Sequence, residues 1–232
     1  MNILALDTST EACSAALAMS GSISERFEFA PRAHSLLILP MLDALLLDAG
    51  ITLAAIDAIA FGCGPGSFTG LRIAAGIAQG VAFGADLPVV PVSSLAALAQ
   101  GASAKTGAQK ILAAIDARMG EIYWGAYQCA ENGLVQLQAC EGVHAPGQVP
   151  LPEGKAWLGA GSGWETYGAI LQLRLSNLLT GYESDYYPHA GDVACLAEEY
   201  FKQGLAVTAE QAVPVYLRNE VAWKKMDKAT PG

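Results

Sequence analysis

The amino-acid sequence predicts an α/β protein made of two related domains, each a mixed β-sheet that opens with a three-strand meander and is flanked by helices. Three observations support this prediction. Each half begins with three consecutive strand-like segments, strands and helices alternate after them in the first half, and a small polar stretch at 101–109 resembles a linker. We therefore expect an N-terminal domain at 1–104 and a C-terminal domain at 105–232, whose last residues, from about 218, pack back on the first domain.

The first half shows the pattern in detail. An apolar run at 2–9 ends in Asp-Thr-Ser, and two further strands within 12–30 are joined at Ser20-Gly21-Ser22. A helix from about 33 to 49 follows and ends at Gly50, because glycine readily adopts the left-handed conformation that closes a helix. The remaining predicted elements are a strand at 56–62, a glycine-rich loop at 63–70, a helix at 71–85, a strand at 88–92 and a helix at 94–102.

The second half repeats the opening. A strand ending in Asp116, a turn at Met119-Gly120, a strand up to Cys129 and a third strand within 133–143 form the second meander. The later predicted elements are a strand at 155–161, helices at 163–175 and 192–204, and a terminal segment at 214–225 of undefined form. Two halves with the same opening indicate an internal structural duplication, although no residue-level repeat is visible.

Composition excludes several classes of function. The chain has 232 residues, 53% of them hydrophobic, and a net charge of −9. An acidic protein is poorly suited to grip nucleic acid, because such binding neutralises phosphates with Lys and Arg. The basic end of the chain is the exception, and we favour an ordinary solvated terminus there over a phosphate contact. Its basic residues are Arg218, Lys224, Lys225 and Lys228.

Cysteine usage and hydropathy predict a cytoplasmic protein. The five cysteines are scattered and lack the spacing of a metal site, so we expect small core residues in a reducing compartment. The N-terminus has no positively charged region before its apolar run, unlike a signal peptide. The densest apolar stretch, 36–50, is interrupted by Pro40 and Asp43 and is too short to cross a bilayer.

Two loops invite a phosphate-binding interpretation. The sequence GPGSFTG at 64–70 precedes a helix, but it lacks the Lys and Ser/Thr of a P-loop, so we favour a structural turn. Asp7, Thr8 and Ser9 end the first strand and are weak candidates for holding a magnesium-bound phosphate. We favour a strand-end turn capped by its own side chains, because the glycine that lets phosphate approach such a hairpin is missing.

The sequence offers no catalytic constellation. The histidines at 34, 144 and 189 have no partner at metal-ligand spacing, and we expect polar surface residues. Asp116 and Arg118 lie at a hairpin turn, where an ion pair that holds the turn is expected. No serine or cysteine lies in the context of a nucleophile. We expect no catalytic residue and no resident metal.

The two helices of the first half carry the sharper signal. Nearly every residue between Leu36 and Leu47 is apolar, more than one sheet face can cover. The next helix has Gly76, Gly80 and Gly84 at intervals of four, and each helical glycine costs about 1 kcal/mol relative to alanine. A glycine stripe lets another helix approach closely. We favour a partner-binding face over simple core packing.

Several segments together resemble the TsaB (YeaZ) family of bacterial tRNA threonylcarbamoyladenosine biosynthesis proteins. They are ILALDTST, HSLLILPMLDALL, GPGSFTGLRIAAGIAQGVAFG, PVVPVSSLAALA, IDARMGEIYWGAY and YLRNEVAWK. The match covers most of the chain, with GPGSFTGLR the most specific block and 129–190 the weakest stretch. The resemblance implies an actin-like, ribonuclease H-like fold and a paralogous partner, TsaD, that performs the chemistry. It also implies a third protein, the ATPase TsaE.

The resemblance further implies that a metal site has been lost. TsaD-like sequences carry a His-x-x-x-His pair after the equivalent of the strand at 88–92, two imidazoles one helical turn apart. The equivalent positions here are Ser94 and Leu98, and leucine cannot bind a metal. The chain therefore resembles a catalytically silent paralogue that acts as a scaffold or activator. ATP and metal are then expected on the partner proteins, and tRNA contact is expected to be indirect.

The expected partner interface lies on the helices at about 33–49 and 70–84, and without TsaD a homodimer could use the same face. Its candidate residues are Leu36, Leu37, Leu39, Pro40, Met41, Asp43, Leu47, Leu71, Arg72, Ala75, Gly76, Gln79, Gly80 and Phe83. Two alternatives stay open. One is an enzyme, either an actin-like ATPase or a metalloprotease-type protein. The sequence has no metal ligands at protease spacing, which counts against the metalloprotease. The other is a direct tRNA-binding module that uses the basic tail at 218–232.

Overall fold

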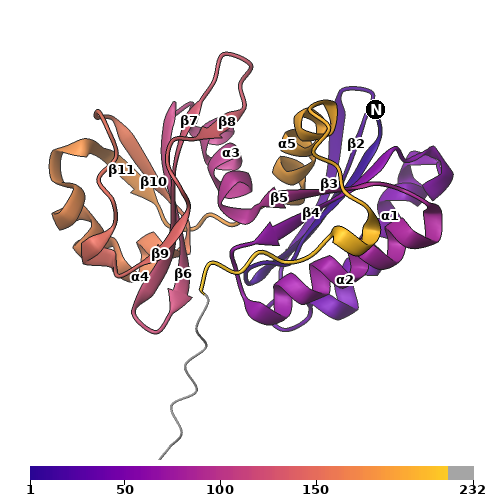
Figure 1. Ribbon diagram of the computed structural model, residues 1–232, viewed down its shortest axis with the longest axis horizontal. Coiled ribbons are helices and arrows are strands. Elements are labelled where there is room, and N and C mark those ends of the chain that lie inside the picture. Colours follow the sequence, from indigo (N-terminus) through magenta and orange to yellow (C-terminus); the bar gives the residue numbers. More distant parts are fainter. Residues whose placement is uncertain (219–232) are drawn as a thin grey trace, which may run out of the picture.

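The structure, a computed structural model, describes residues 1–218 and contains two mixed sheets with helices around them (Figure 1). The first sheet has the strand order β3-β2-β1-β4-β5. Its strands are β1 (Ile3–Asp7), β2 (Ala12–Met19), β3 (Ser22–Phe29), β4 (Ala58–Gly64) and β5 (Val89–Ser93). The three N-terminal strands form the predicted antiparallel meander, while β4 and β5 add in parallel to β1. The continuous apolar run of β1 suits a strand that is buried on both faces.

The second sheet repeats this topology. Its order is β11-β10-β6-β7-β8, and β9 also pairs with β7. The strands are β6 (Lys110–Arg118), β7 (Glu121–Cys129), β8 (Val135–Leu137), β9 (Gly142–His144), β10 (Trp157–Ala160) and β11 (Leu179–Glu183). As in the first sheet, a meander is followed by two parallel strands that extend the sheet from its first strand. The expected structural duplication is therefore visible in the strand order.

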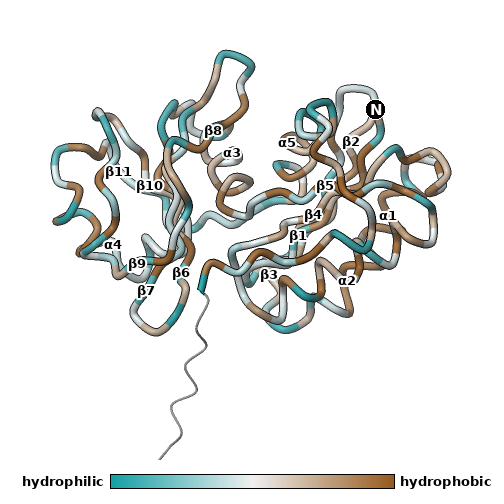
Figure 2. The backbone as a smooth tube through the Cα atoms, in the orientation of Figure 1, coloured by the Kyte–Doolittle hydropathy of each residue, from teal (hydrophilic) through white to brown (hydrophobic). Residues whose placement is uncertain are grey.

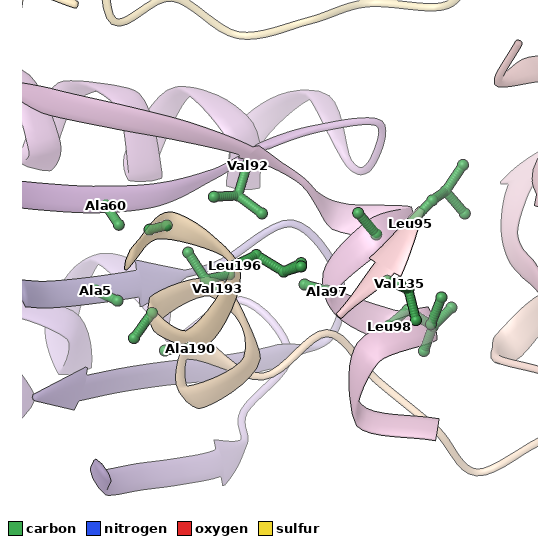
Figure 3. Close-up of a cluster of buried hydrophobic side chains, with 14 of the residues drawn as sticks. Ala5, Ala60, Val92, Leu95, Ala97, Leu98, Val135, Ala190, Val193 and Leu196 are labelled. Carbon is green, nitrogen blue, oxygen red and sulfur yellow. The ribbon is translucent and has the colours of Figure 1, made fainter. Parts of the chain in front are cut away.

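Helices fill three layers. α1 (His34–Ala49) and α2 (Phe68–Ala85) cover the outer face of the first sheet, and α4 (Ser162–Leu175) covers the outer face of the second. α3 (Ser94–Thr106) and α5 (Ala190–Lys202) lie between the sheets, where their apolar side chains form the central core (Figure 3). Short 3-10 helices at Leu53–Ala55, Pro146–Gln148, Ser176–Leu178 and Ala209–Gln211 complete the fold. No helix within residues 1–218 is long and apolar enough to cross a membrane.

The two inner helices each pack on the sheet of the other half. α3 follows the first sheet in sequence but packs on β6 and β7, whereas α5 follows the second sheet and packs on β1 and β2. The segment after α5 also returns to the first half, since Val207 pairs with Val89 and the Val215 amide donates to the Cys63 carbonyl. A boundary between 104 and 105 therefore separates the sheets but not the packed units. The segment that packs back on the first half therefore begins before 218, and the expectation for the residues after 218 lies outside the described residues.

Local chemistry explains most element ends, and three expectations were wrong. Gly50 closes α1 with a φ of 66°, and the hydroxyls of Ser67 and Ser93 accept backbone amides at the starts of α2 and α3. The stretch 101–109 is not a linker, because α3 continues to Thr106. The expected third strand at 133–143 is split into β8 and β9, and β11 was not expected at all.

Candidate functional site

The glycine-rich loop lies directly on the first hairpin. The Thr8 hydroxyl donates to the Gly70 carbonyl over 2.8 Å, and the Ser67 amide donates to the Ser9 carbonyl over 2.7 Å. A Cβ atom on Gly66 would lie 2.4 Å from the Ser9 oxygen, and one on Gly70 would lie 1.9 Å from the Thr8 oxygen. These glycines therefore permit backbone-to-backbone packing, the structural role that the sequence favoured.

Asp7 is enclosed behind this contact. Its side chain is fully buried, and Oδ1 accepts the amide and the hydroxyl of Ser9 at 2.9 and 2.8 Å. Oδ2 has no hydrogen-bond partner among the described residues, and a Cβ atom on Gly62 would lie 1.8 Å from it. Desolvation by burial raises the pKa of Asp7 to about 6. Asp7 and Thr8 thus hold the hairpin in place, and both side chains are buried.

A cavity of about 550 Å³ lies between the first hairpin and the turn of the second. Arg118 spans it, donating to Asp116 over 3.1 Å and to Glu11 over 2.6 Å, which confirms the expected turn ion pair and adds a link between the halves. Arg218 donates to the Ala117 carbonyl over 3.1 Å and pairs with Glu121. Arg218 is therefore bound to the second sheet rather than solvated.

The guanidinium groups of Arg118 and Arg218 are both neutralised by acidic partners. Among the described residues, the cavity of about 550 Å³ therefore offers no unpaired cation for a phosphate. The other basic residues of the tail, Lys224, Lys225 and Lys228, lie outside the described residues.

The positions compared with the His-x-x-x-His pair are packed in the interior. Ser94 and Leu98 are both fully buried, and Leu98 belongs to the core shown in Figure 3. A Cβ atom on Gly161 would lie 2.6 Å from Leu98 Cδ2, so that side chain fills the space beside the second sheet. Within residues 1–218, no three His, Cys, Asp or Glu side chains are grouped to hold a metal.

Other expectations about single residues need correction. His34 is buried at the start of α1, not exposed, because it shares a helix side with Ile38 and Met41, which pack towards the first sheet. His189 is half-buried and contacts Glu25 over 2.9 Å. All five cysteines are free thiols; two of them are buried as expected, but Cys140 is exposed.

The most open apolar surface lies on α1 and α2, which Figure 2 shows to be hydrophobic along most of their length. Leu36 and Leu47 on α1 are 75% and 80% exposed, and Phe83 on α2 is 74% exposed. Leu39, Pro40 and Asp43 are also exposed, and with Leu36 and Leu47 they follow the helical spacing of one face. We call these residues, with Arg72, Gly76, Gly80 and Phe83 on α2, the α1/α2 face.

The glycine stripe belongs to this face. Gly76, Gly80 and Gly84 are exposed, and a Cβ atom on any of them would meet no atom within 4 Å. The inner side of α2 instead packs through alanines and Leu71 on the first sheet. The glycines are therefore not required by packing inside the protomer, and they leave a shallow strip between larger side chains.

Not every expected interface residue lies on this face. Met41, Leu71 and Ala75 are buried in the core of the first half, so their side chains cannot meet a partner. Leu37 and Gln79 are half-buried, and the Gln79 amide donates to the Ala212 carbonyl over 3.0 Å. The prediction failed here because an apolar residue on a helix that is apolar all round can point either way.

Sequence reasoning also missed an exposed aromatic residue. Phe68 opens α2, and the Arg72 guanidinium lies 3.5 Å above its ring. Its ring also lies 5.6 Å from that of Tyr216, so the C-terminal segment reaches the edge of the α1/α2 face. The signal available in the sequence was Phe68 itself, an aromatic residue within the glycine-rich segment GPGSFTG.

Comparison with known proteins places the chain in a family. The family model described as "TsaD: tRNA N6-adenosine threonylcarbamoyltransferase" matches residues 27–226. The tRNA threonylcarbamoyladenosine biosynthesis protein TsaB of Escherichia coli strain K12 is 46% identical over 97% of this chain and 98% of its own length. The TsaB protein of Haemophilus influenzae is 42% identical, with 97% of each chain covered.

A solved structure agrees with the sequence relatives. YeaZ from Pseudomonas aeruginosa superposes with a TM-score of 0.88 at 47% identity, covering 93% of this chain and 99% of the other. The two sheets have the same strand order, and the family match extends along nearly the whole chain. These findings confirm the expected actin-like, ribonuclease H-like architecture. The chain therefore belongs to the TsaB (YeaZ) family.

Proposed function

We propose that this chain acts in threonylcarbamoyladenosine modification of tRNA as a non-catalytic scaffold that binds and activates TsaD. The observation that supports this most directly is the α1/α2 face, where large apolar side chains and an open glycine strip lie together in solvent. Large apolar side chains gathered on an exposed surface are typical of a site that a partner covers. The relatives' names indicate the pathway, and the exposed surface supports a role in binding a partner.

The covered first hairpin, with Asp7 enclosed, supports a role without catalysis. A phosphate-binding hairpin needs a free backbone and an accessible carboxylate, but the loop at 64–70 covers this hairpin and Asp7 is enclosed. Under this proposal TsaD transfers threonylcarbamoyl from its adenylate to the adenosine beside the anticodon, while this chain stabilises the active form of TsaD. The ATPase TsaE then joins the pair, and ATP and metal belong to the partners.

Charge placed on the face tests the proposal. Gly80→Glu should leave the protomer folded, because the new side chain meets open space, yet it should bury a charge at the interface with TsaD. We expect an affinity loss of about 30-fold or more, which is the size of a 2 kcal/mol interface hot spot. The measurement is isothermal titration of purified TsaD into the wild type and the variant.

A matched pair of leucines controls for surface chemistry. Leu47 on α1 is 80% exposed and Leu173 on α4 is 82% exposed, but only Leu47 lies on the α1/α2 face. Leu47→Glu should weaken TsaD binding and Leu173→Glu should not. Equal affinities for the wild type and both variants would reject this interface.

The same face accounts for a homodimer when TsaD is absent. Self-association needs only that the surface be complementary to itself, so Leu36→Glu should lower the dimer fraction in sedimentation velocity. Magnesium-dependent ATP binding by the isolated chain, lost in Asp7→Asn, would instead favour the ATPase alternative.

A further inference from the structure

The outer strand of the first sheet has an open edge on the side of the molecule that carries α5. β3 ends the strand order, all eight of its residues are exposed, and no strand within residues 1–218 pairs with its outer side. Natural edge strands usually discourage pairing with charge, proline or a bulge. β3 carries the charged residues Glu25, Arg26 and Glu28 but no proline or bulge. Its Ile23, Phe27 and Phe29 are nevertheless exposed, the last of them by 54%.

A groove of about 990 Å³ runs beside this edge. Side chains that alternate along a strand point to the same face, so Ile23, Glu25, Phe27 and Phe29 form one wall together. The C-terminal half of α3, from Gln100 to Lys105, and the segment from Asp185 to Cys195 line the rest. The groove thus lies where a strand added to β3 would place every second side chain.

The groove is held in shape by contacts between β3 and the start of α5. The Glu25 carboxylate accepts the Gly191 amide over 2.8 Å and contacts His189 Nδ1 over 2.9 Å. The Phe27 ring stacks on His189 with 4.3 Å between centroids, and the Phe29 ring lies 5.4 Å from that of Tyr187. A binding segment would therefore meet a preformed wall and would not have to order it, which lowers the cost of association.

The charges that face the groove favour a cationic occupant. Its carboxyl groups are those of Glu25, Asp185 and Asp192, and its basic groups are Lys105 and His189. No ion pair within residues 1–218 involves Asp185 or Asp192. The Lys105 ammonium already lies 4.7 Å from the centre of the Tyr186 ring, which shows that the aromatic wall accommodates a cation.

We propose that β3 and this groove bind an extended basic segment of a partner protein, which adds a strand to the sheet edge and directs its Lys or Arg side chains at Asp185 and Asp192. Strand addition supplies backbone hydrogen bonds, and the alternating pockets supply selectivity. A second copy of this chain is a poor occupant, because pairing two β3 strands would bring together the Glu25 carboxylates of two proteins that each carry a charge of −9.

The proposal predicts a pH dependence. Burial raises the pKa of Asp192 to about 7, and the hydrogen bond to Glu25 raises the pKa of His189. Raising the pH through neutrality therefore adds negative charge at Asp192, which should tighten binding of a cationic segment between about pH 6 and about pH 8. Loss of the positive charge of His189, which occurs at a higher pH than for an ordinary histidine, acts in the same direction.

Fluorescence anisotropy with synthetic peptides tests the inference on the whole protein. The probe is a labelled peptide of alternating valine and lysine, and its counterpart carries glutamate in place of lysine. We expect saturable binding of the lysine peptide only, weakened about 10-fold by Asp192→Asn and by Phe27→Ala. An N-methylated lysine peptide, which cannot pair with a strand edge, should not bind.

Two control variants separate this site from other surfaces. Glu28→Gln changes an equally exposed residue on the opposite face of β3 and should leave the affinity unchanged. Leu47→Glu, which disrupts the α1/α2 face, should also have no effect. Asp185→Asn gives a second test of the charge contact should circular dichroism show Asp192→Asn to be unfolded. Failure of the lysine peptide to bind, equal binding of the glutamate peptide, or equal weakening by Glu28→Gln would overturn the proposal.

Discussion

The two halves of this protein share a strand order but differ in what covers their outer faces. The first sheet carries two helices on its outer face, α1 and α2, whereas the second carries α4 (Figure 1). At the point in the chain order that corresponds to α1, the second half has only the short helix Pro146–Gln148. In the second half, Trp164 of α4 and Trp157 of β10 are fully buried in one apolar cluster, and the exposed apolar residues of α4 stand among polar ones. Exposed apolar side chains therefore gather on two neighbouring helices in the first half, whereas in the second half they stand singly on α4.

The inner layer shows a second contrast. α3 and α5 each pack on the sheet of the other half, so the two sheets cannot separate without opening the shared core. The shared core includes Leu95, Leu98, Val193 and Leu196, which are all fully buried.

The largest expected effect concerns the second half of the protein. Trp164 is fully buried, and its indole donates to the Leu112 carbonyl over 2.9 Å. Trp164→Ala should lower the free energy of unfolding by about 3 to 5 kcal/mol, through cavity formation and an orphaned carbonyl. Urea denaturation measures this change. A loss below about 1 kcal/mol would mean that the outer layer of the second half is loosely packed and not self-contained.

The enclosed carboxylate should make stability depend on pH. The pKa of Asp7 is about 6 in the folded protein, against 3.8 for an unperturbed aspartate such as that of the unfolded chain, so the folded protein binds the proton more tightly. Stability should therefore rise as the pH falls from above 6 towards 4, by up to about 3 kcal/mol. Asp192, whose pKa is also raised, contributes in the same direction.

Asp7→Asn isolates the first of these groups. The variant should be at least as stable as the wild type at about pH 8 and should show a smaller rise in stability on acidification, as measured by urea denaturation. An unchanged pH profile would show that Asp7 is solvated and could still face a ligand.

The smallest effects compare two glycines of α2. Gly70→Ala should destabilise the protein by about 1 to 3 kcal/mol, because the new methyl group would lie against the Thr8 carbonyl. Gly76→Ala should stabilise the isolated protomer by about 0.5 to 1 kcal/mol, since its Cβ meets open space in a helix interior. Thermal denaturation measures both.

The same pair distinguishes packing from partner binding. If Gly76→Ala stabilises the protomer but weakens TsaD binding, the glycine is retained for the interface. If it destabilises the protomer, α2 is packed more closely than the structure indicates.

The sequence predicted the elements whose signals are local. The meanders, the end of α1 at Gly50, the turn pair of Asp116 and Arg118, and the structural role of GPGSFTG all depend on residues close in the chain or on backbone chemistry. It did not predict that α3 continues beyond 102 to Thr106, since Gly101 and Lys105 look like linker residues. Gly101 is instead required beside Asp192, a contact with a residue far along the chain.

What the sequence determined by itself is therefore the order and type of most elements, the family resemblance and the excess of apolar surface on two helices, because periodicity and short motifs specify these. Only the tertiary structure decided which side of each helix is covered. Leu36 and Leu47 are exposed while Met41 and Leu71 are buried, although all are apolar residues in helices of the same kind. It also decided that α3 and α5 exchange sheets, because that outcome depends on contacts between segments far apart in the chain, which no local pattern encodes.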